Sequence, residues 1–399
     1  MKAADKKFKI AYVCPRYIPG TAGGAEVLIR QWAERMLGRG NLSEVLTTCA
    51  RDHISWDNEY PPGVEVIDGV TVHRFPVNSR DAEQHAFYDR RITDAEEMSR
   101  EEEIEWMKSG VNSDALCAYI SDHRDEYDCF IFTPYLFGIT YFGLNLVPDK
   151  SILVPCLHDE PVAYLKTTRD LFRKARGIFF NSNPEKELAG RITDLEGKMT
   201  KVVGLGVEAP SSPSGEAFRN KFEISSPYIL YAGRREILKN TRLLIEYFRA
   251  FKNHQGTDLK LLFIGTGEID LNKQDRDNII DLGYLSEEDK WNAYAGALAF
   301  CQPSTNESFS IVLLEAFLAG TPGLVNAFCP VTLEHCLKSA GGFYFQDYFE
   351  FEESLLYLMD NPETAAAMGA NGRRYVRDYF SWKDVLDRLE DGIADCLKI

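Results

Sequence analysis

The chain has 399 residues, 45% of them hydrophobic, which is enough for two or three domains with separate hydrophobic cores. Its formal net charge of −16 argues against nucleic acid as a partner and against broad docking on anionic lipid, because both present negative phosphates. No stretch approaches the roughly 20 apolar residues of a membrane helix, and the start of the chain lacks the apolar core of a signal peptide. We therefore expect a cytoplasmic protein without a transmembrane segment, for which peripheral membrane contact stays open.

Strand and helix signals alternate along the first half of the chain. Longer helical stretches separate several of the short apolar runs, and this alternation predicts a parallel sheet wrapped by helices. The expected strands are Lys9–Cys14, Val45–Thr48, Val70–Phe75, Cys129–Phe132, Ser151–Pro155 and Ile178–Asn181.

A linker follows at Glu208–Gly215, where two prolines, three serines and a glycine fall within eight residues. The alternation then restarts, and the chain ends in the helical segments Pro362–Tyr379 and Ser381–Leu397. We therefore predict an α/β protein of two Rossmann-like, doubly wound domains, residues 1–207 and 208–380, with ligands bound in the cleft between them. The expected strands of the second domain are Tyr228–Tyr231, Lys260–Gly265, Ile279–Leu282, Leu298–Gln302, Gly323–Asn326 and Gly342–Phe345.

The segment Asp81 to Glu105 departs from this pattern because it is rich in glutamate. The simplest interpretation is a solvated helix that meets the body of the protein at Trp106 and Met107. A lid on the acceptor side of an active site is the alternative.

The strongest functional signal is the pair Glu307 and Glu315, eight residues apart. Ser308 and Ser310 favour a helix start, so we expect a helix over Ile311 to Ala319. The exposed N–H groups of its first turn would hold phosphate oxygens. Glu307 would accept hydrogen bonds from sugar hydroxyls, and Glu315 from a ribose diol. The alternative is two surface glutamates, but Glu315 stands in a helix that is apolar on nearly every face, where an unpartnered carboxylate is costly.

A second motif, Tyr231 to Asn240, leads from a strand through a glycine into a helix. The planar fork of Arg234 would grip phosphate, and Lys239 would add a point charge five residues later. Two cations would neutralise a departing nucleoside diphosphate and remove any strict need for a divalent metal. Two basic residues at a helix start mean little alone, but the glutamate pair favours the functional interpretation.

Two motifs of the first domain also follow strands. Gly23 and Gly24 precede the helical stretch Val27 to Leu37, and adjacent glycines let the backbone approach a phosphate or sugar. A flexible turn is the alternative, and the dinucleotide pattern Gly-x-Gly-x-x-Gly is missing. His158 comes just past the strand Ser151–Pro155 and would hydrogen-bond near the sugar C6 or the acceptor, unless it is a structural histidine.

Weaker signals complete the set. Gly265 stands in a tight turn after a strand, and Tyr284 would border a nucleobase. For each of them, a turn with a purely structural role is the alternative. Cys329, His335 and Cys336 suggest a metal site, but no fourth ligand is obvious, so we expect no metal. The nine scattered cysteines predict reduced thiols, not disulfides.

Together these residues resemble the retaining glycosyltransferases of the GT-B fold, the group called family four or glycosyl transferases group 1, over essentially the whole length. The Glu-x7-Glu signature at Glu307 and Glu315 is the most specific match. The double glycine, Gly233-Arg234 with Lys239, His158 and Phe180-Asn-Ser182 fit as well. The ending Phe380-Ser381-Trp382 resembles the point where the family sends a helix back to the first domain, so residues 381–399 would belong there.

The resemblance implies a role for each matched position and a donor class. The anomeric configuration would be retained, and the only cofactor-like molecule would be the nucleoside-diphosphate sugar itself, with UDP favoured over GDP. The acceptor is an unidentified saccharide, lipid-linked saccharide or small molecule. Glu307 would bind the transferred sugar, Glu315 the ribose, Arg234 and Lys239 the diphosphate, the backbone at Phe309 and Ser310 the sugar and phosphate, and Tyr284 the base.

The chain also departs from the family. Asn240, Ser308 and Ser310 stand where glycine is common, which puts the choice of donor in doubt more than the activity. A sugar-nucleotide epimerase or sugar phosphorylase of the same architecture, and a non-catalytic sugar-nucleotide-binding protein, are the alternatives. An NAD-dependent oxidoreductase is the weakest, because its glycine fingerprint is missing.

Overall fold

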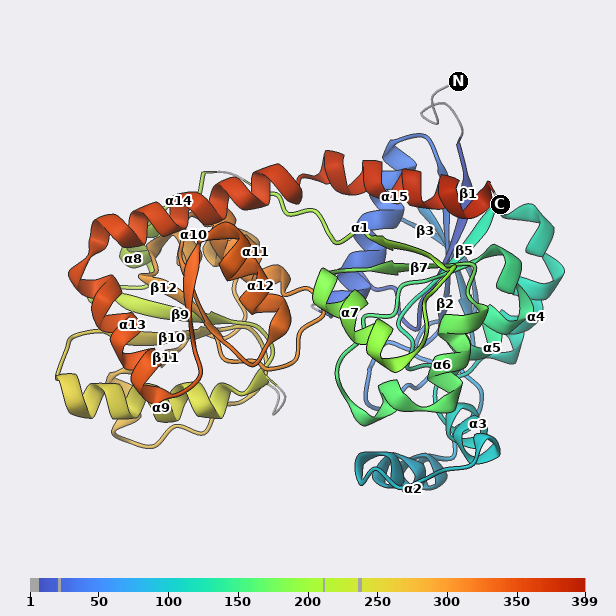
Figure 1. Ribbon diagram of the computed structural model, residues 1–399, viewed down its shortest axis with the longest axis horizontal. Coiled ribbons are helices and arrows are strands. Elements are labelled where there is room, and N and C mark those ends of the chain that lie inside the picture. Colours follow the sequence, from blue (N-terminus) through green and yellow to red (C-terminus); the bar gives the residue numbers. More distant parts are fainter. Residues whose placement is uncertain (1–6, 21–22, 211, 236–238, 399) are drawn as a thin grey trace. The chain divides into compact units, whose positions relative to one another are not determined.

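A computed structural model describes residues 7–20, 23–210, 212–235 and 239–398. The chain divides into two compact units, Met1–Gly204 with Leu386–Ile399, and Leu205–Val385 (Figure 1). The sequence placed the divisions after residues 207 and 380, whereas the structure has them after residues 204 and 385. Each unit is built on its own sheet, so the two are described separately.

The sheet of the first unit has eight strands in the order β3-β4-β2-β1-β5-β6-β7-β8. All six expected strands are present, and two strands were missed. One is β3, which pairs antiparallel with β4 at the edge and exposes its side chains, so it lacks the signal of a buried strand. The other is the short, half-buried β8. The strands are β1 (Lys9–Val13), β2 (Leu42–Thr48), β3 (Gly63–Ile67), β4 (Val70–Phe75), β5 (Cys129–Phe132), β6 (Ser151–Leu153), β7 (Gly177–Phe180) and β8 (Met199–Val202).

Helices cover both faces of this sheet. The helices α1 and α15 pack on one face, and α4 to α7 pack on the other around a large apolar core (Figure 1). The helices of the first unit are α1 (Gly24–Gly38), α2 (Ala82–Thr93), α3 (Arg100–Ser109), α4 (Asp114–Asp122), α5 (Gly138–Leu146), α6 (Lys166–Lys174), α7 (Asn183–Ile192) and α15 (Trp382–Leu397).

The end of the chain belongs to the first unit because α15 is anchored there at several points. The Arg388 guanidinium donates to the Val203 carbonyl at 2.9 Å, and Arg39 pairs with Glu390 at 2.8 Å. A side chain at Gly392 would run into Phe179 of β7, so the close packing needs glycine there. The returning helix implied by the GT-B resemblance is therefore present.

The second unit has a six-stranded, entirely parallel sheet in the order β11-β10-β9-β12-β13-β14. Its six expected strands are confirmed, and their ends differ from the predicted ones by at most one residue. The strands are β9 (Tyr228–Ala232), β10 (Lys260–Ile264), β11 (Ile279–Asp281), β12 (Ala299–Gln302), β13 (Gly323–Asn326) and β14 (Gly342–Phe345). An α/β fold of two doubly wound units was correctly predicted, apart from the antiparallel edge strand of the first.

Helices also cover both faces of the second sheet. The helices α9 and α13 contribute phenylalanines and leucines to a core on one face, and α10 to α12 pack on the other (Figure 1). The helices of the second unit are α8 (Gly215–Lys221), α9 (Thr241–Gln255), α10 (Glu287–Gly296), α11 (Ile311–Ala319), α12 (Pro330–Ser339), α13 (Tyr348–Asp360) and α14 (Pro362–Tyr379).

The acidic segment forms two helices, α2 and α3, instead of one. Asp81 caps the first, and Ser99 forms a capping box with Glu102 at the second. Glu103 is an exception to the expected solvation, because it is buried and accepts the Thr167 N–H at 2.7 Å.

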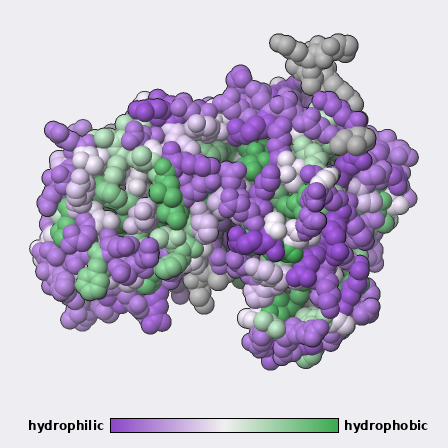
Figure 2. Space-filling model, in the orientation of Figure 1, coloured by the Kyte–Doolittle hydropathy of each residue, from purple (hydrophilic) through white to green (hydrophobic). Residues whose placement is uncertain are grey.

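The visible surface is mostly polar. Figure 2 shows hydrophilic residues over most of the visible face of the molecule. Within the described residues, no helix has both the length and the apolar character needed to cross a bilayer. All nine cysteines are free thiols, as expected.

Candidate functional site

Three loops of the second unit meet at the carboxyl ends of β9, β10 and β11. Gly233 N–H donates to the Ile264 carbonyl at 3.0 Å, and Gly265 N–H donates to the Gly283 carbonyl at 2.8 Å. Gly265 has φ +117, and a Cβ there would collide with the Gly233 carbonyl, so the close approach of the loops requires glycine. Tyr284 follows Gly283 and is 65% exposed at this edge. The predicted residues Gly265 and Tyr284 therefore lie on neighbouring loops.

Two adjacent arginines in the first of these loops differ in role. The Arg235 side chain is only 2% exposed, pairs with Asp281 and donates to the Gly267 carbonyl at 2.6 Å. It holds the three loops together and was not singled out from the sequence. The predicted Arg234 is half-buried, and its carbonyl accepts the Tyr231 hydroxyl at 2.7 Å. Within the motif Tyr231 to Asn240, residues 236–238 lie outside the described residues.

Glu307 and Lys239, assigned separately from the sequence, form an ion pair. Lys239 Nζ lies 2.8 Å from Glu307 Oε1, and Gln302 Nε2 donates to the same oxygen at 2.8 Å. The Glu307 side chain is 10% exposed. Gln302 is the buried last residue of β12, and sequence reasoning missed it, although its place at a strand end was a usable signal. Among the described residues, both hydrogen bonds to Glu307 fall on Oε1.

Glu315 lies in α11 and is largely but not fully buried, with its side chain 12% exposed, and it has protein partners. Lys290 Nζ lies 2.9 Å from Oε1, and the Tyr294 hydroxyl donates to Oε2 at 3.0 Å. Burial lowers the pKa of Lys290, but the Glu315 and Glu287 carboxylates outweigh it and leave the pKa above its ordinary value. Burial and Glu315 together raise the pKa of Tyr294. The carboxylate is thus satisfied without a ligand, which weakens the argument made from its burial alone.

The start of α11 corrects the expectation that serines cap this helix. The helix covers the predicted Ile311 to Ala319, but Ser310 at its N-cap is left-handed, with φ 62, and makes no capping hydrogen bond. Its hydroxyl is buried and has no partner among the described residues. Ser308 and Phe309 precede it in the loop, half-buried and buried respectively. The first turn of α11 therefore begins without a side-chain cap, and its N–H groups can bind an anion.

The start of α9 has the same unusual conformation. Asn240 is left-handed, with φ 55, and its amide donates to the Pro303 carbonyl at 3.3 Å. Asn326, at the end of β13, donates to the same carbonyl at 3.1 Å. Asn240 and Ser310 both adopt the backbone conformation that favours glycine. Pro303 therefore links the start of α9 to the end of β13.

His335 supports the loop before α11, a role that was not anticipated. Its Nε2 lies 3.0 Å from the Phe309 carbonyl, and its Nδ1 lies 3.0 Å from the Tyr375 hydroxyl. A carbonyl only accepts, so Nε2 carries the proton, and the neutral ring accepts from Tyr375 through Nδ1. Burial lowers the pKa of His335 to about 4, which keeps the ring neutral.

These contacts also bear on the metal hypothesis for Cys329, His335 and Cys336. Both His335 nitrogens already have protein partners, and burial raises the pKa of both thiols. Over the described ranges, no group of three or more histidine, cysteine, aspartate or glutamate residues is arranged to hold a metal ion.

The remaining predicted residues belong to the first unit. Gly23 is the extended N-cap of α1, and Gly24 is the first residue of that helix, while residues 21–22 lie outside the described residues. A side chain at Gly23 would collide with Glu26, which pairs with Arg16. Glycine at position 23 therefore leaves room for the Arg16–Glu26 ion pair, as well as for any ligand that approaches the backbone.

His158 is half-buried in the segment after β6, and a buried carboxylate holds that segment in place. Glu185 accepts the Leu157 N–H at 2.7 Å and the Asn181 N–H at the start of α7. Burial raises the pKa of Glu185 to about 8, against the lowering effect of these backbone donors. Sequence reasoning missed Glu185, which reads as an ordinary first-turn helix residue.

Residues 215–375, most of the second unit, match the family model for glycosyl transferases group 1. This part of the second unit is therefore similar to glycosyl transferases group 1. The whole chain is similar to D-inositol 3-phosphate glycosyltransferase of Saccharomonospora viridis, with 22% identity over 95% of this chain and 91% of that protein. A stretch covering 33% of this chain is 32% identical to a GDP-mannose-dependent monoacylated alpha-(1-6)-phosphatidylinositol monomannoside mannosyltransferase of Corynebacterium glutamicum, covering 38% of that protein.

Solved structures extend the likeness to the fold of the whole chain. Anabaena HepE in complex with UDP and glucose superposes with a TM-score of 0.70 and 14% identity, covering 97% of this chain and 100% of that one. Both units thus have the GT-B arrangement of strands and helices expected from the sequence. The whole chain therefore has the GT-B fold, and residues 215–375 are similar to glycosyl transferases group 1.

Proposed function

We propose that this protein transfers a hexosyl group from a nucleoside-diphosphate sugar to an acceptor hydroxyl with retention of the anomeric configuration. The observation that carries the proposal is the Lys239–Glu307 pair, 2.8 Å apart, beside a helix start that has no side-chain cap. A cation, a carboxylate and free N–H groups side by side suit a ligand that combines an anionic diphosphate with a hydroxylated ring.

The diphosphate would lie between the start of α11 and the cations Arg234 and Lys239. The N–H groups near Ser310 and Ile311 would bind its oxygens, helped by the positive end of the helix dipole. As the bond to the sugar breaks, negative charge develops on the leaving nucleoside diphosphate, and the two cations stabilise it. We propose that they make a resident metal unnecessary and that no other cofactor is needed.

Glu307 would bind the transferred sugar. Lys239 and Gln302 hold the carboxylate through Oε1, which fixes its orientation and leaves Oε2 for ring hydroxyls. The backbone at Ser308 and Phe309 would complete this part of the site. Retention would follow from attack on the same face of the sugar, assisted by the leaving phosphate.

Glu315 would bind the ribose diol of the donor, and Tyr284 would contact its nucleobase. Each Glu315 oxygen already accepts one protein donor, from Lys290 and Tyr294, and keeps a lone pair for a ribose hydroxyl. Lys290 and Tyr294 would then orient the carboxylate and not compete with the ligand.

In the first unit, His158 would bind near the sugar C6 or the acceptor, and Gly23 and Gly24 would let the backbone approach the donor. We favour a UDP-sugar, since HepE was solved with UDP, but the mannosyltransferase relative depends on GDP-mannose. We further propose a cytoplasmic location on the basis of composition.

A thermal-shift screen against UDP, GDP, ADP and their sugars tests the proposal. A ligand at a hundredfold excess over its dissociation constant stabilises the folded protein by about 2.7 kcal/mol. We expect one nucleoside diphosphate to raise the melting temperature, Glu315→Gln to reduce that rise, and Glu363→Gln, an exposed change on α14, to leave it intact. No shift with any of these ligands would refute the proposal, and turnover of the donor into an epimer would refute transfer.

A further inference from the structure

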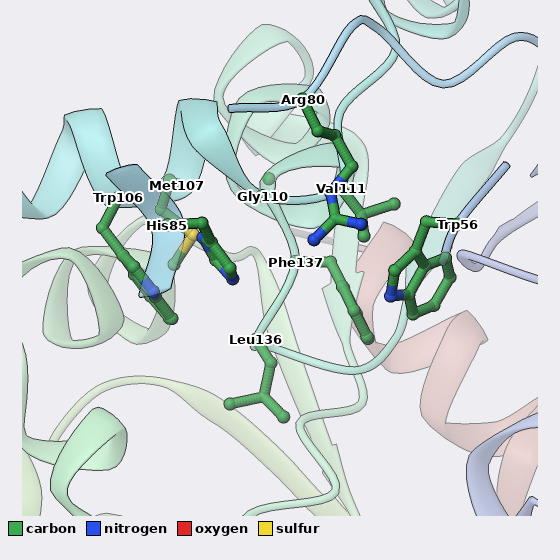
Figure 3. A pocket seen from close by; sticks show the side chains of 10 residues that line it. Trp56, Arg80, His85, Trp106, Met107, Gly110, Val111, Leu136 and Phe137 are labelled. Carbon is green, nitrogen blue, oxygen red and sulfur yellow. The ribbon is translucent and has the colours of Figure 1, made fainter. Parts of the chain in front are cut away.

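A pocket of about 160 Å³ lies in the first unit, where the segments that follow β2, β4 and β5 come together. Its walls include Trp56, Arg80, His85, Trp106 and Phe137 (Figure 3). At about 30 Å³ for each water molecule, the space would hold roughly five waters, which is about the room taken by one six-membered ring.

The pocket occupies the position where a sheet of this kind binds ligands. In the first sheet β1 lies between β2 and β5, and the order of the strands reverses there. Such a switch point opens a crevice at the carboxyl ends of the strands, because the following segments leave in opposite directions. Trp56 follows β2 and Phe137 follows β5, so the lining comes from both sides of the crevice.

The charge of the lining is the reverse of that of the whole protein. The chain has 61 acidic and 45 basic residues, yet the pocket is lined by one arginine, one histidine and no carboxylate. Arg80 donates to the Ser55 carbonyl at 3.0 Å through one terminal nitrogen, and its Nε is buried with no partner among the described residues. Figure 3 shows the guanidinium directed into the space between His85 and Trp56. A buried donor without a partner is costly, and an anion would satisfy it.

The walls on either side of Arg80 are flat and held in place. Trp56 and Phe137 pack edge to face with centroids 5.2 Å apart. His85 stacks on Trp106 at 5.8 Å with an angle of 6° between the rings, and Asp89 accepts the Trp106 N–H at 2.6 Å. Fixed aromatic faces of this kind bind the face of a ring at little cost in entropy.

A second pocket of the same unit gives a contrast. It is open and about 500 Å³ in volume, and two cations, Lys166 and Arg169, line it together with five carboxylates. The carboxylates are those of Glu96, Glu97, Glu103, Asp159 and Glu160. The carboxylates outnumber the cations, so this lining disfavours an anion by charge repulsion. The anionic ligand therefore belongs in the pocket that contains Arg80.

We infer that the Arg80 pocket binds the acceptor through a ring that carries a carboxylate or phosphate, with the ring between Trp56 and His85 and the anionic group on Arg80. The identity of this ligand as the acceptor rests on the proposed function. The ligand class rests only on the pocket itself.

Tryptophan fluorescence tests the inference, because Trp56 and Trp106 both line the pocket. Glucuronate, glucose 6-phosphate and glucose would be titrated into the full-length protein, so that the first two probes distinguish a ring carboxylate from a ring phosphate. We expect at least one anionic probe to bind tenfold or more tightly than glucose. In Arg80→Gln that preference should disappear, and in the control Arg173→Gln, whose side chain is 60% exposed, it should remain.

Equal binding of glucose and the anionic probes, no response to either anion, or an unchanged preference in Arg80→Gln would each overturn the inference. The proposed function fails on a different measurement, namely the absence of stabilisation by any nucleoside diphosphate. If an anionic probe binds and no nucleotide does, the pocket is confirmed as an anion site, and only the identity of its ligand as the acceptor is refuted.

Discussion

Lys290 Nζ lies 2.9 Å from Glu315 Oε1, and this contact ties α10 to α11. The two side chains are 22% and 12% exposed. Tyr294, one helical turn after Lys290, donates to the other Glu315 oxygen. The orientation of the carboxylate proposed to bind ribose therefore depends on two residues of a neighbouring helix.

Replacing Lys290 by Met should strongly destabilise the second unit. The change leaves the largely buried Glu315 carboxylate without its counter-charge, and losing a hydrogen bond to a charged group costs about 1.5–3 kcal/mol. Urea unfolding measures the loss, and the double variant Lys290→Met with Glu315→Leu should recover most of it. Lys338→Met, at a more exposed pair with Glu334, is the control and should cost less than about 1 kcal/mol. Equal losses at the two lysines would contradict the role given to Lys290.

Glu307→Ala should abolish most transfer while donor binding weakens only modestly. The carboxylate is proposed to act on the sugar, and loss of one group that stabilises a transition state typically costs about a hundredfold in kcat. The measurements are kcat at saturating donor and the donor Kd by calorimetry. A variant that loses donor binding but turns over normally at saturation would show that Glu307 has a different role.

Ser310→Gly should stabilise the protein, whereas Asn240→Gly should be nearly neutral. Both residues are left-handed, a conformation that costs most side chains roughly 1 kcal/mol. Ser310 also buries an unpartnered hydroxyl, so glycine relieves both costs, and we expect a gain of about 1 kcal/mol in the free energy of unfolding. Asn240 loses its hydrogen bond to Pro303, which offsets the gain. Urea unfolding of the two variants side by side decides this, and a loss of stability in Ser310→Gly would contradict the prediction.

His335 should make stability fall in acid. Its pKa is about 4 in the folded protein and about 6.5 in the unfolded chain, so between these values the unfolded chain binds a proton that the folded one does not. Stability is therefore complete above about pH 6.5 and declines as the pH falls towards 4, by about 3 kcal/mol in total from this residue.

His335→Gln removes that titration. The difference in unfolding free energy between the two proteins should narrow as the pH falls from 6.5 to 4, because only the parent loses this contribution. Parallel curves over that range, measured by urea unfolding, would show that His335 is not held neutral.

Glu185→Ala should destabilise the first unit and impair transfer, and Glu185→Gln should restore much of both. Alanine leaves the buried N–H groups of Leu157 and Asn181 without an acceptor, at about 1–3 kcal/mol each, whereas glutamine keeps one carbonyl oxygen. Thermal unfolding and kcat with a fixed donor are the measurements. The exposed change Glu187→Ala on the same helix is the control and should affect neither.

Local patterns in the sequence were sufficient for most of the fold. Short apolar runs separated by helical stretches predicted twelve of the strands, because a buried strand needs apolar side chains wherever it is placed. The antiparallel β3 was missed because its exposed side chains carry no such signal. Glu307, Glu315, Arg234 and Lys239 were also recognisable, since carboxylates and cations near strand ends and helix starts have a chemical meaning that depends on short spacings.

The partners of those residues were decided only by the tertiary structure. Lys290 and Tyr294 reach Glu315 from a helix more than 20 residues away, and His335 reaches Phe309 across 26 residues. Spacing along the chain says nothing about contacts of this range, because they depend on how separate helices pack on one sheet. By itself the amino-acid sequence determined which side chains were available for the chemistry. Packing decided which of them lie together. Proximity makes a glutamate and a lysine an ion pair, whereas burial holds a histidine neutral.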